Sequence, residues 1–212
     1  MKDEKCAVTG MLTIDDLPFL KDYNQLKPRL SMRLNDFRRI APDVLTQPFL
    51  DFSVTFHIDV SDVVGREGAS CIMKKEMLDY LKVGKARIFH DAIENSLEMR
   101  PAVTMPIEKY MGGMGYKEIE ERSGLMIATT EGLAYGAVVV MYPGFLKGIS
   151  GGKDLYLIPS SVHEWLYLED TGEWGKEQLT GLLQAVNREV VEEKDFLSDD
   201  LYCWRGGEFK RA

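Results

Sequence analysis

Residues 51–60, DFSVTFHIDV, alternate apolar and polar side chains, and this period of two is typical of a β-strand with one buried face. The apolar members are Phe52, Val54, Phe56 and Ile58, and the polar members are Ser53, Thr55, His57 and Asp59. Further strands are predicted within 125–141, which contains a continuous apolar run, within 154–168, and at 202–205. Because turns separate these segments, we expect hairpin-type connections and a mostly antiparallel sheet.

Three amphipathic helices are predicted where apolar residues recur at spacings of three and four. They cover residues 24–40, 85–99 and 176–191. Their stripes are Leu26, Leu30, Leu34 and Phe37 in the first, Ile88, Ala92, Ile93 and Leu97 in the second, and Leu179, Leu182, Leu183, Val186 and Val190 in the third. Residues 100–123 contain two prolines and the string MGGMG, which predicts a long irregular excursion.

Strands interrupted by helices, without regular strand–helix–strand units, indicate an α+β fold. We expect a twisted, mostly antiparallel sheet covered by the amphipathic helices. A chain of 212 residues can bury a sizeable core without disulfides or metal ions. The sequence therefore predicts a single domain over residues 24–212, preceded by an N-terminal extension over 1–23.

Composition restricts the setting in which the chain works. No run approaches the roughly 20 apolar residues that a membrane helix requires, and the start MKDEKCAVTG lacks the apolar core of a signal peptide. The three cysteines, Cys6, Cys71 and Cys203, are spaced too widely for a paired disulfide framework or a CxxC metal site. These features predict a cytoplasmic protein without a membrane span.

The net charge of −8 is concentrated near the C-terminus. Residues 161–200 hold eleven acidic and three basic side chains, whereas the remaining acids and bases balance. Because phosphate backbones are bound by concentrated lysine and arginine, direct nucleic-acid binding is not expected. The acidic quarter is either a solvated surface or a face that docks into a basic groove of another protein.

The string PSSVHE holds the best candidates for chemistry, which are Ser160, Ser161, His163 and Glu164. Two hydroxyls, an imidazole and a carboxylate after a strand could supply a nucleophile, a base and an orienting group, or an anion-binding turn. The same residues are ordinary turn formers whose hydroxyls bond to nearby backbone N–H groups, and this structural interpretation is the stronger one. In a regular strand His163 and Glu164 would point to opposite faces, so they converge only if the turn is irregular.

Other catalytic and ligand-binding templates fail on inspection. HEWLY has Tyr167 where HExxH needs its second histidine, and GISGGKD departs from a P-loop at Lys147 and Asp154. GGMGYKE lacks the third glycine of a dinucleotide-binding motif. The other histidines, His57 and His90, are far apart in the sequence, which makes a weak case for a metal site. No metal ion, cofactor or complete catalytic motif is therefore predicted.

Six strings of the sequence follow one another between about Gln25 and Phe209: RLNDFRRI, PFLDFSVTFHI, YGAVVVMYPGFLK, DLYLIPSSVHEWLYL, VNREVV and LSDDLYCW. In these strings the chain resembles a bacterial domain family of unknown function. The most recognisable signature of that family is PSSxHE, here residues 159–164. The resemblance implies a cytoplasmic, single-domain bacterial protein, and it supplies no activity, cofactor or substrate.

Two features favour binding over catalysis. Met111 and Met114 lie beside tyrosines in a glycine-rich segment and could form an adaptable apolar surface. The carboxylates that could form an acidic docking face are those of Glu192, Glu193, Asp199 and Asp200. We therefore favour a small, non-catalytic binding or regulatory protein that acts through contacts with another protein.

Two alternatives stay open. One is a hydrolase-like enzyme that uses Ser160, Ser161, His163 and Glu164 of the PSSVHE turn. The other is an acidic inhibitor of a nucleic-acid-binding protein, encoded on a mobile element. The sequence predicts neither the identity of the partner nor the oligomeric state.

Overall fold

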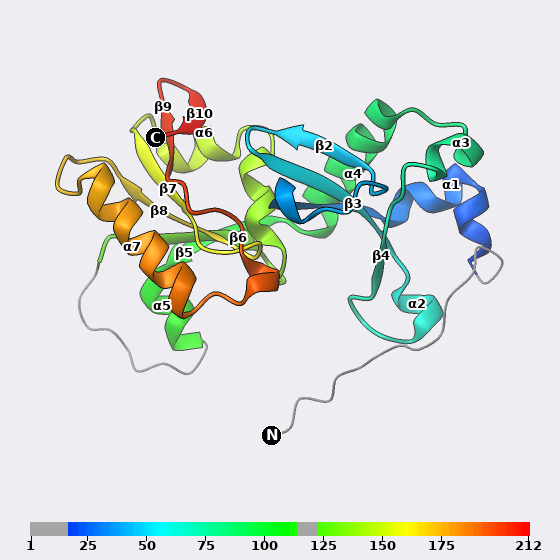
Figure 1. The fold of residues 1–212 in the computed structure, drawn as a ribbon, viewed down its shortest axis with the longest axis horizontal. Helices are drawn as coiled ribbons and strands as arrows, with labels where there is room; N and C mark the ends of the chain where they lie inside the picture. Colours follow the sequence, from blue (N-terminus) through cyan, green and yellow to red (C-terminus); the bar gives the residue numbers. More distant parts are fainter. Residues whose placement is uncertain (1–16, 114–122) are drawn as a thin grey trace.

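The computed structural model describes residues 17–113 and 123–212. The fold is α+β, as predicted, but the strands form two antiparallel sheets rather than one. A four-stranded sheet with the N-terminal helices makes up one half of the molecule, and a six-stranded sheet with the C-terminal helix makes up the other (Figure 1). The strands predicted within 154–168 and at 202–205 belong to the six-stranded sheet, whereas the strand predicted at 51–60 belongs to the four-stranded sheet.

Strand β3 lies at the centre of the four-stranded sheet. The strands of this sheet are β1 (Leu30–Asp36), β2 (Thr46–Phe49), β3 (Phe52–Asp59) and β4 (Ser70–Ile72). One edge of β3 pairs along its length with β1, and the other edge pairs first with β2 and then with β4. The helices of this half are α1 (Tyr23–Leu26), α2 (Ser61–Val64), α3 (Met77–Leu81) and α4 (Lys85–Met99), of which α4 packs against β1.

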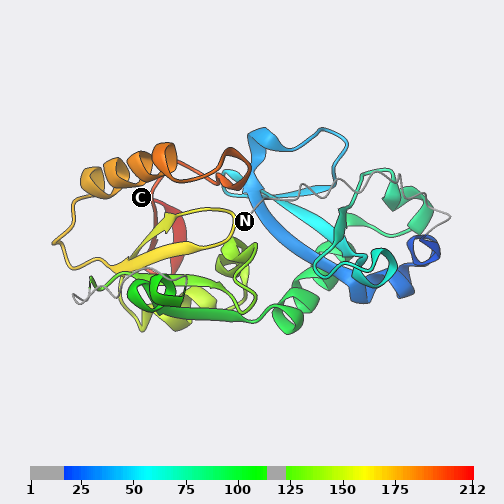
Figure 2. The same cartoon turned by 90° about the horizontal axis from the view of Figure 1, so that it is seen from below.

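The six-stranded sheet has the order β10-β9-β7-β8-β6-β5. Its strands are β5 (Ala102–Pro106), β6 (Met126–Thr130), β7 (Leu155–Pro159), β8 (Trp165–Glu169), β9 (Tyr202–Arg205) and β10 (Glu208–Arg211). The helices of this half are α5 (Ile107–Gly113), α6 (Phe145–Ser150) and α7 (Lys176–Glu189). Helix α7 runs along one face of this sheet, and α5 and α6 lie on the other side (Figure 2).

Short 3-10 helices fill several connections. They are η1 (Pro18–Lys21), η2 (Lys27–Arg29), η3 (Phe37–Arg39), η4 (Gly136–Met141) and η5 (Glu193–Asp195). Among them η4 is the most buried, because five of its six residues are inaccessible to solvent. This segment crosses between the two halves of the molecule and contacts both β6 and β1.

One large hydrophobic core joins the two sheets. At its centre the ring of Phe52 of β3 packs edge-on against Trp165 of β8. The same ring packs at a tilt against Tyr202 of β9. Trp165 is fully buried, and its indole N–H donates a hydrogen bond of 2.7 Å to the carbonyl of Ala137. A second, smaller core lies beneath α7 and consists of Tyr156, Ile158, Leu168, Leu179, Leu183, Leu201 and Cys203.

The helix predicted over 24–40 is wrong. Only Tyr23–Leu26 forms an α-helical turn, and the segment from Leu30 onward is the strand β1. Leu30 and Leu34 fit a helical spacing of four, but with Met32 they also fit a period of two. All three side chains are fully buried on one face of the sheet, so burial against the core decides between the two periods.

The strand predicted in the apolar run of 125–141 is also wrong beyond Thr130. The run forms the buried 3-10 helix η4, because an uninterrupted apolar run does not distinguish a buried strand from a buried helix. Leu133 and Tyr135 adopt positive φ angles of 53° and 54°, which end the extended conformation before the run begins. The irregular excursion predicted over 100–123 is likewise wrong in its first part, where β5 and α5 occupy residues 102–113.

Two of the three predicted helices are confirmed. Helix α4 has the predicted bounds, Lys85–Met99, and α7 ends two residues before the predicted end. The second face of β3, predicted to be exposed, is buried in part, since Thr55 and His57 are 0% and 8% exposed.

Candidate functional site

The PSSVHE segment connects β7 to β8 in a tight, hydrogen-bonded turn. The hydroxyl of Ser161 accepts a bond of 3.0 Å from the backbone N–H of His163 and donates one of 2.8 Å to the carboxylate of Glu164. The backbone N–H of Ser161 also donates to the carbonyl of Glu164. Ser161 and Glu164 therefore close the turn upon itself, which is the structural role that serines commonly have in turns.

His163 uses both of its ring nitrogens in contacts that fix the turn to neighbouring segments. Nδ1 accepts a hydrogen bond of 3.0 Å from the backbone N–H of Tyr135, so the ring proton of the neutral form lies on Nε2. Nε2 lies 3.2 Å from the carboxylate of Asp195. The geometry thus joins the imidazole of His163 to Asp195 and gives the ring no hydrogen bond to the hydroxyl of Ser160 or Ser161, so the nucleophile–base pair of a hydrolase is not formed.

Gly136 explains why the turn approaches η4 so closely. A Cβ atom at this position would lie 2.2 Å from Oγ1 of Thr129 and 2.6 Å from the carbonyl oxygen of His163. The same carbonyl accepts a hydrogen bond of 2.8 Å from Thr129, and the carbonyl of Val162 accepts one from Ala137. The turn, the end of β6 and the start of η4 are therefore locked together around one glycine.

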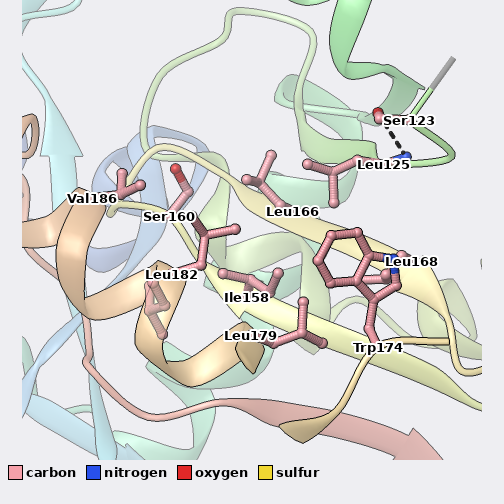
Figure 3. Close-up of a pocket in the computed structure, with 11 residues that line it drawn as sticks. Ser123, Leu125, Ile158, Ser160, Leu166, Leu168, Trp174, Leu179, Leu182 and Val186 are labelled. Carbon is pink, nitrogen blue, oxygen red and sulfur yellow. Dashed lines mark hydrogen bonds between the residues drawn. The ribbon is translucent and has the colours of Figure 1, made fainter. Parts of the chain in front are cut away.

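Ser160, the first serine of the segment, takes no part in these contacts around Gly136 and lines an apolar pocket beneath α7 (Figure 3). The pocket has a volume of about 310 Å³ and opens between α7 and the strands β7 and β8. Its lining residues are Ser123, Leu125, Ile158, Ser160, Leu166, Leu168, Trp174, Leu179, Leu182, Leu183 and Val186. All of these except the two serines are apolar, so the pocket has the composition of a binding site for an apolar group.

The apolar stripe of α7 is only half used in packing. Leu179 and Leu183 are 3% exposed, whereas Leu182 is 53% exposed and Val186 is 37% exposed. Trp174, in the loop before the helix, is 46% exposed and closes one end of the pocket (Figure 3). The stripe therefore packs against the sheet only along its inner half. A contiguous exposed apolar surface of this kind is typical of an interaction site.

Acidic residues are frequent in α7 and in the segments on either side of it. Residues 169–195 contain eight acids and three bases. The carboxylates of Glu173, Glu177 and Glu189 are exposed and form no ion pair with the described part of the chain. The segment that supplies one wall of the apolar pocket is therefore rich in negative charge.

The four carboxylates predicted to form a docking face all contact groups of their own chain. Their partners are Lys194 for Glu192 at 2.9 Å, Arg39 for Glu193 at 3.6 Å, Asn187 for Asp199 at 2.8 Å and Arg211 for Asp200 at 2.6 Å. Three of them are thus partly neutralised within the molecule. Of the two predicted methionines, Met111 is half-buried on α5, and Met114 lies outside the described residues.

The other two histidines, His57 and His90, lie among charged residues of the same chain. Burial, together with the charges of Arg33 and Arg100, lowers the pKa of His57 to about 3. His90 lies near Asp91 and Glu94, and ligand atoms of the three residues lie within 4.8 Å of one another. A cation would have to compete there for Asp91, which already accepts a hydrogen bond from Tyr23 and pairs with Lys27 and Arg87.

The two described cysteines, Cys71 and Cys203, are free thiols. Burial raises the pKa of each thiol, which disfavours the reactive thiolate form.

Sequence reasoning missed the importance of Trp174. The only signal is a large aromatic residue in the otherwise polar loop TGEWGK, because such a residue has no core partner within its own segment.

Comparison with known proteins places the chain in a family. None of the helices within 17–113 and 123–212 has the length and apolar character needed to cross a membrane. Neither a curated protein nor a solved structure matches the chain. A family model covers residues 8–205, which is nearly the whole sequence. The chain therefore belongs to a family of unknown function, DUF5688.

Proposed function

We propose that this is a non-catalytic binding protein that takes up a basic, amphipathic segment of a partner protein in the groove beneath α7. We call this groove the α7 groove; it consists of the apolar pocket of Figure 3 and the exposed side chains of Leu182, Val186 and Trp174. The observation that carries the proposal is this open, almost entirely apolar pocket beside a helix and loop whose exposed carboxylates, Glu173, Glu177 and Glu189, form no ion pair with the described residues. The free thiols suit a reducing environment, and we place the protein in the cytoplasm.

The apolar character of the partner follows from the cost of leaving α7 half uncovered. Leu182 and Val186 lie four residues apart, so they face the same side of the helix and act as one surface. Full burial of a leucine or valine side chain is worth roughly 1.5–3 kcal/mol. A partner helix with apolar residues at matching spacings would recover this free energy by lying in the groove.

The basic character of the partner follows from the charges around the groove. Glu173, Glu177 and Glu189 would attract lysine or arginine side chains that flank the apolar residues of the partner. The same carboxylates would repel the head group of a fatty acid, which argues against a simple lipid ligand. Lys176 and Arg188 also lie on α7, but residues 169–195 hold eight acids against three bases.

The hydrolase alternative is less well supported. The imidazole of His163 has no hydrogen bond to a hydroxyl, and the hydroxyl of Ser161 donates to Glu164 inside the turn. The acidic-inhibitor alternative is less specific, because the carboxylates of Glu192, Glu193 and Asp200 pair with bases of the same chain. The α7 groove adds the directional apolar contact that an acidic surface alone does not supply.

Tryptophan fluorescence tests the proposal directly, since Trp174 lies at the end of the groove. The probe is a synthetic amphipathic peptide of leucine and lysine, and the comparison is the same pattern with glutamate in place of lysine. We expect the lysine peptide to shift the emission of the wild-type protein to shorter wavelength, in a manner weakened by salt. A Trp174→Phe variant should lose this shift, because Trp165 is fully buried and Trp204 lies outside the groove.

Leu182→Ser should weaken binding of the lysine peptide by about tenfold or more, since it removes an apolar contact at the groove. Leu97→Ser is the matched control, because Leu97 is also a helical leucine, 39% exposed, on the other half of the molecule. Equal binding of the glutamate peptide, or an unchanged affinity in Leu182→Ser, would contradict the proposal. A shift produced by oleate and not by either peptide would show that the pocket takes a lipid instead.

A further inference from the structure

The four-stranded sheet turns a polar face toward the other half of the molecule. The residues on this face are Ser31, Arg33 and Asn35 of β1, Thr55 and His57 of β3, and Ser70 of β4. Ser31 and His57 are directly paired across the strands, and both are nearly inaccessible to solvent. Polar groups in such a position require hydrogen-bond partners or counter-charges.

Arg33 is the first of two cations at this face. Its guanidinium lies over the ring of Tyr135, 3.5 Å from the centroid, and its Nη2 donates a hydrogen bond of 2.6 Å to the hydroxyl of Ser70. Its Nε atom is buried and has no hydrogen-bond partner among the described residues. Burial lowers the pKa of Arg33, and the charge of Arg100 lowers it further.

Arg100, at the C-terminal end of α4, is the second cation. Its backbone carbonyl accepts a hydrogen bond from Tyr142, but its Nη1 atom is buried without a partner in the described part of the chain. Neither Arg33 nor Arg100 forms an ion pair with a carboxylate of residues 17–113 or 123–212. Two like charges are therefore held near each other in a partly buried place, and neither has an ion-pair partner among the described residues.

A cavity of about 360 Å³ opens beside these cations. Arg100, Ser31, Ser70 and Thr130 are among the residues that line it, and Arg33 stands behind Ser70. Because Ser70 accepts its hydrogen bond from Arg33, the hydroxyl hydrogen of Ser70 is free to donate.

Three further charged residues line the same cavity, and its two carboxylates, Asp59 and Glu67, form no ion pair with Arg33 or Arg100. Arg29 is paired with Asp62 at 2.6 Å, outside the lining. Asp59 accepts a hydrogen bond of 2.7 Å from the backbone of Ser61, and Glu67 is exposed.

We propose that this cavity binds a small molecule through an oxyanionic group, either carboxylate or phosphoryl, which the guanidinium of Arg100 and the hydroxyl of Ser70 contact directly. Arg33 supports the site as a positioning residue, because it orients Ser70 and adds positive charge behind it. Guanidinium groups bind planar carboxylates and phosphoryl groups through paired hydrogen bonds, and an anion would supply the ion-pair partner that Arg100 does not find among the described residues. This site is separate from the α7 groove, and neither proposal depends on the other.

The His163 turn gives the site part of its rigidity. The ring of His163 accepts a hydrogen bond from the backbone of Tyr135, and the ring of Tyr135 packs on Arg33. The PSSVHE segment thus acts on the site through Tyr135 and does not touch the cavity.

Thermal unfolding of the full chain tests the proposal with two probes, inorganic phosphate and citrate, against chloride at equal ionic strength. We expect at least one probe to raise the Tm of the wild-type protein in a saturable manner, since an anion that binds only the folded state stabilises it. A response to phosphate alone identifies a phosphoryl ligand, and a response to citrate alone identifies a carboxylate ligand. The absence of any saturable rise would overturn the proposal.

Arg100→Gln should lose the anion-dependent rise in Tm. Without added anion its Tm should equal or exceed that of the wild-type protein, because the substitution removes a partly buried guanidinium charge that has no ion-pair partner among the described residues. Arg66→Gln is the matched control, since Arg66 is exposed and does not line the cavity, and it should keep the full rise. A rise of the same size in Arg100→Gln would overturn the proposal.

Ser70→Ala provides a second variant in case Arg100→Gln does not fold. It should retain a cooperative transition and need several-fold more anion for the same rise in Tm. An NMR titration of His57 gives an independent reading, because a bound anion would offset the charges of Arg33 and Arg100 and raise the pKa of this ring. Unchanged anion affinity in Ser70→Ala, together with an unchanged His57 titration, would rule the site out.

Discussion

Gly136 shows how a single residue can hold three segments at one point. The space for its missing side chain is occupied by Thr129 and by the backbone of Thr130 and His163. A methyl group would meet backbone atoms 2.5 and 2.6 Å away, and backbone cannot move aside without disturbing the strand end and the turn.

We therefore expect Gly136→Ala to destabilise the protein by about 3 kcal/mol or more, at the upper end of what overpacking costs. Urea unfolding at equilibrium measures this change. Gly181→Ala serves as the control, because Gly181 lies in the middle of α7 with open space at its Cβ position. The control should stabilise the protein by up to about 1 kcal/mol through helix propensity. Equal stability of Gly136→Ala and the wild-type protein would contradict the packing described for this turn.

His57 makes the stability of the protein sensitive to acid. Arg33 on β1 and Arg100 at the end of α4 face its ring, and Thr55 is its neutral hydrogen-bond partner at 2.9 Å. The pKa is 6.5 in the unfolded chain and about 3 in the folded protein, so the unfolded state binds a proton first as the pH falls. The stabilisation is complete above pH 6.5 and is lost by up to about 1.4 kcal/mol per pH unit between pH 6.5 and 3.

A His57→Gln variant should therefore lose much less stability than the wild-type protein between pH 6.5 and 4.5. Urea unfolding at a series of pH values gives the comparison. His90→Gln, which removes an exposed histidine, should behave as the wild-type protein does in this range. If His57→Gln follows the wild-type curve, the ring is not held in its neutral form by burial and by the charges of Arg33 and Arg100.

Among the secondary-structure elements, α4 is tied to the start of the chain by one buried carboxylate. Asp91 of α4 accepts a hydrogen bond of 2.6 Å from the hydroxyl of Tyr23 and pairs with Lys27 at 3.1 Å and Arg87 at 2.7 Å. These contacts hold the pKa of Asp91 well below its usual range. The carboxylate thus stabilises the protein above the ordinary aspartate pKa, and this contribution is lost as the pH falls below that value.

Asp91→Asn should destabilise the protein by roughly 1.5–3 kcal/mol at neutral pH, because a charge-assisted network is replaced by neutral contacts. The change should shrink as the pH falls below the ordinary aspartate pKa. Asp79→Asn on α3 is the control, since Asp79 forms no ion pair within the described residues, and it should alter stability by less than about 0.5 kcal/mol. A loss for Asp91→Asn that does not vary with pH would show that the carboxylate charge is not what matters.

Helices with one apolar face, such as α4 and α7, could be predicted from the sequence. So could β3, in which apolar and polar side chains alternate. The segment of β1 could not, because Leu30 and Leu34 satisfy both a helical and an extended period, and only the partner strand decides. The apolar run in η4 could not either, since a fully buried segment has no polar face to reveal its period.

The candidate sites could be predicted only in part. The sequence indicated the turn of Ser161, His163 and Glu164 and its structural character, because serines in a turn bond locally. It did not indicate the α7 groove, whose walls come from segments more than 50 residues apart. Nor did it indicate the pair of Arg33 and Arg100, which the packing of α4 against β1 brings together.

On the scale of the whole molecule, the two halves share one apolar core and differ in what they expose. The aromatic cluster of Phe52, Trp165 and Tyr202 joins the sheets, so the halves are expected to unfold together. The C-terminal half presents an apolar groove beside an acidic segment. The polar face between the halves holds Arg33 and Arg100, which form no ion pair with the described residues. The net charge of −8 therefore conceals two surfaces of opposite character.

Hydrogen–deuterium exchange of the full chain, with and without the leucine–lysine peptide, shows which segment of the protein the peptide covers. We expect slower amide exchange across residues 174–190 and in β8, and no change in β1 or α4. Leu182→Ser should abolish this protection, and Leu97→Ser should retain it. Protection confined to residues 192–200, or no protection in any segment, would contradict binding in the α7 groove.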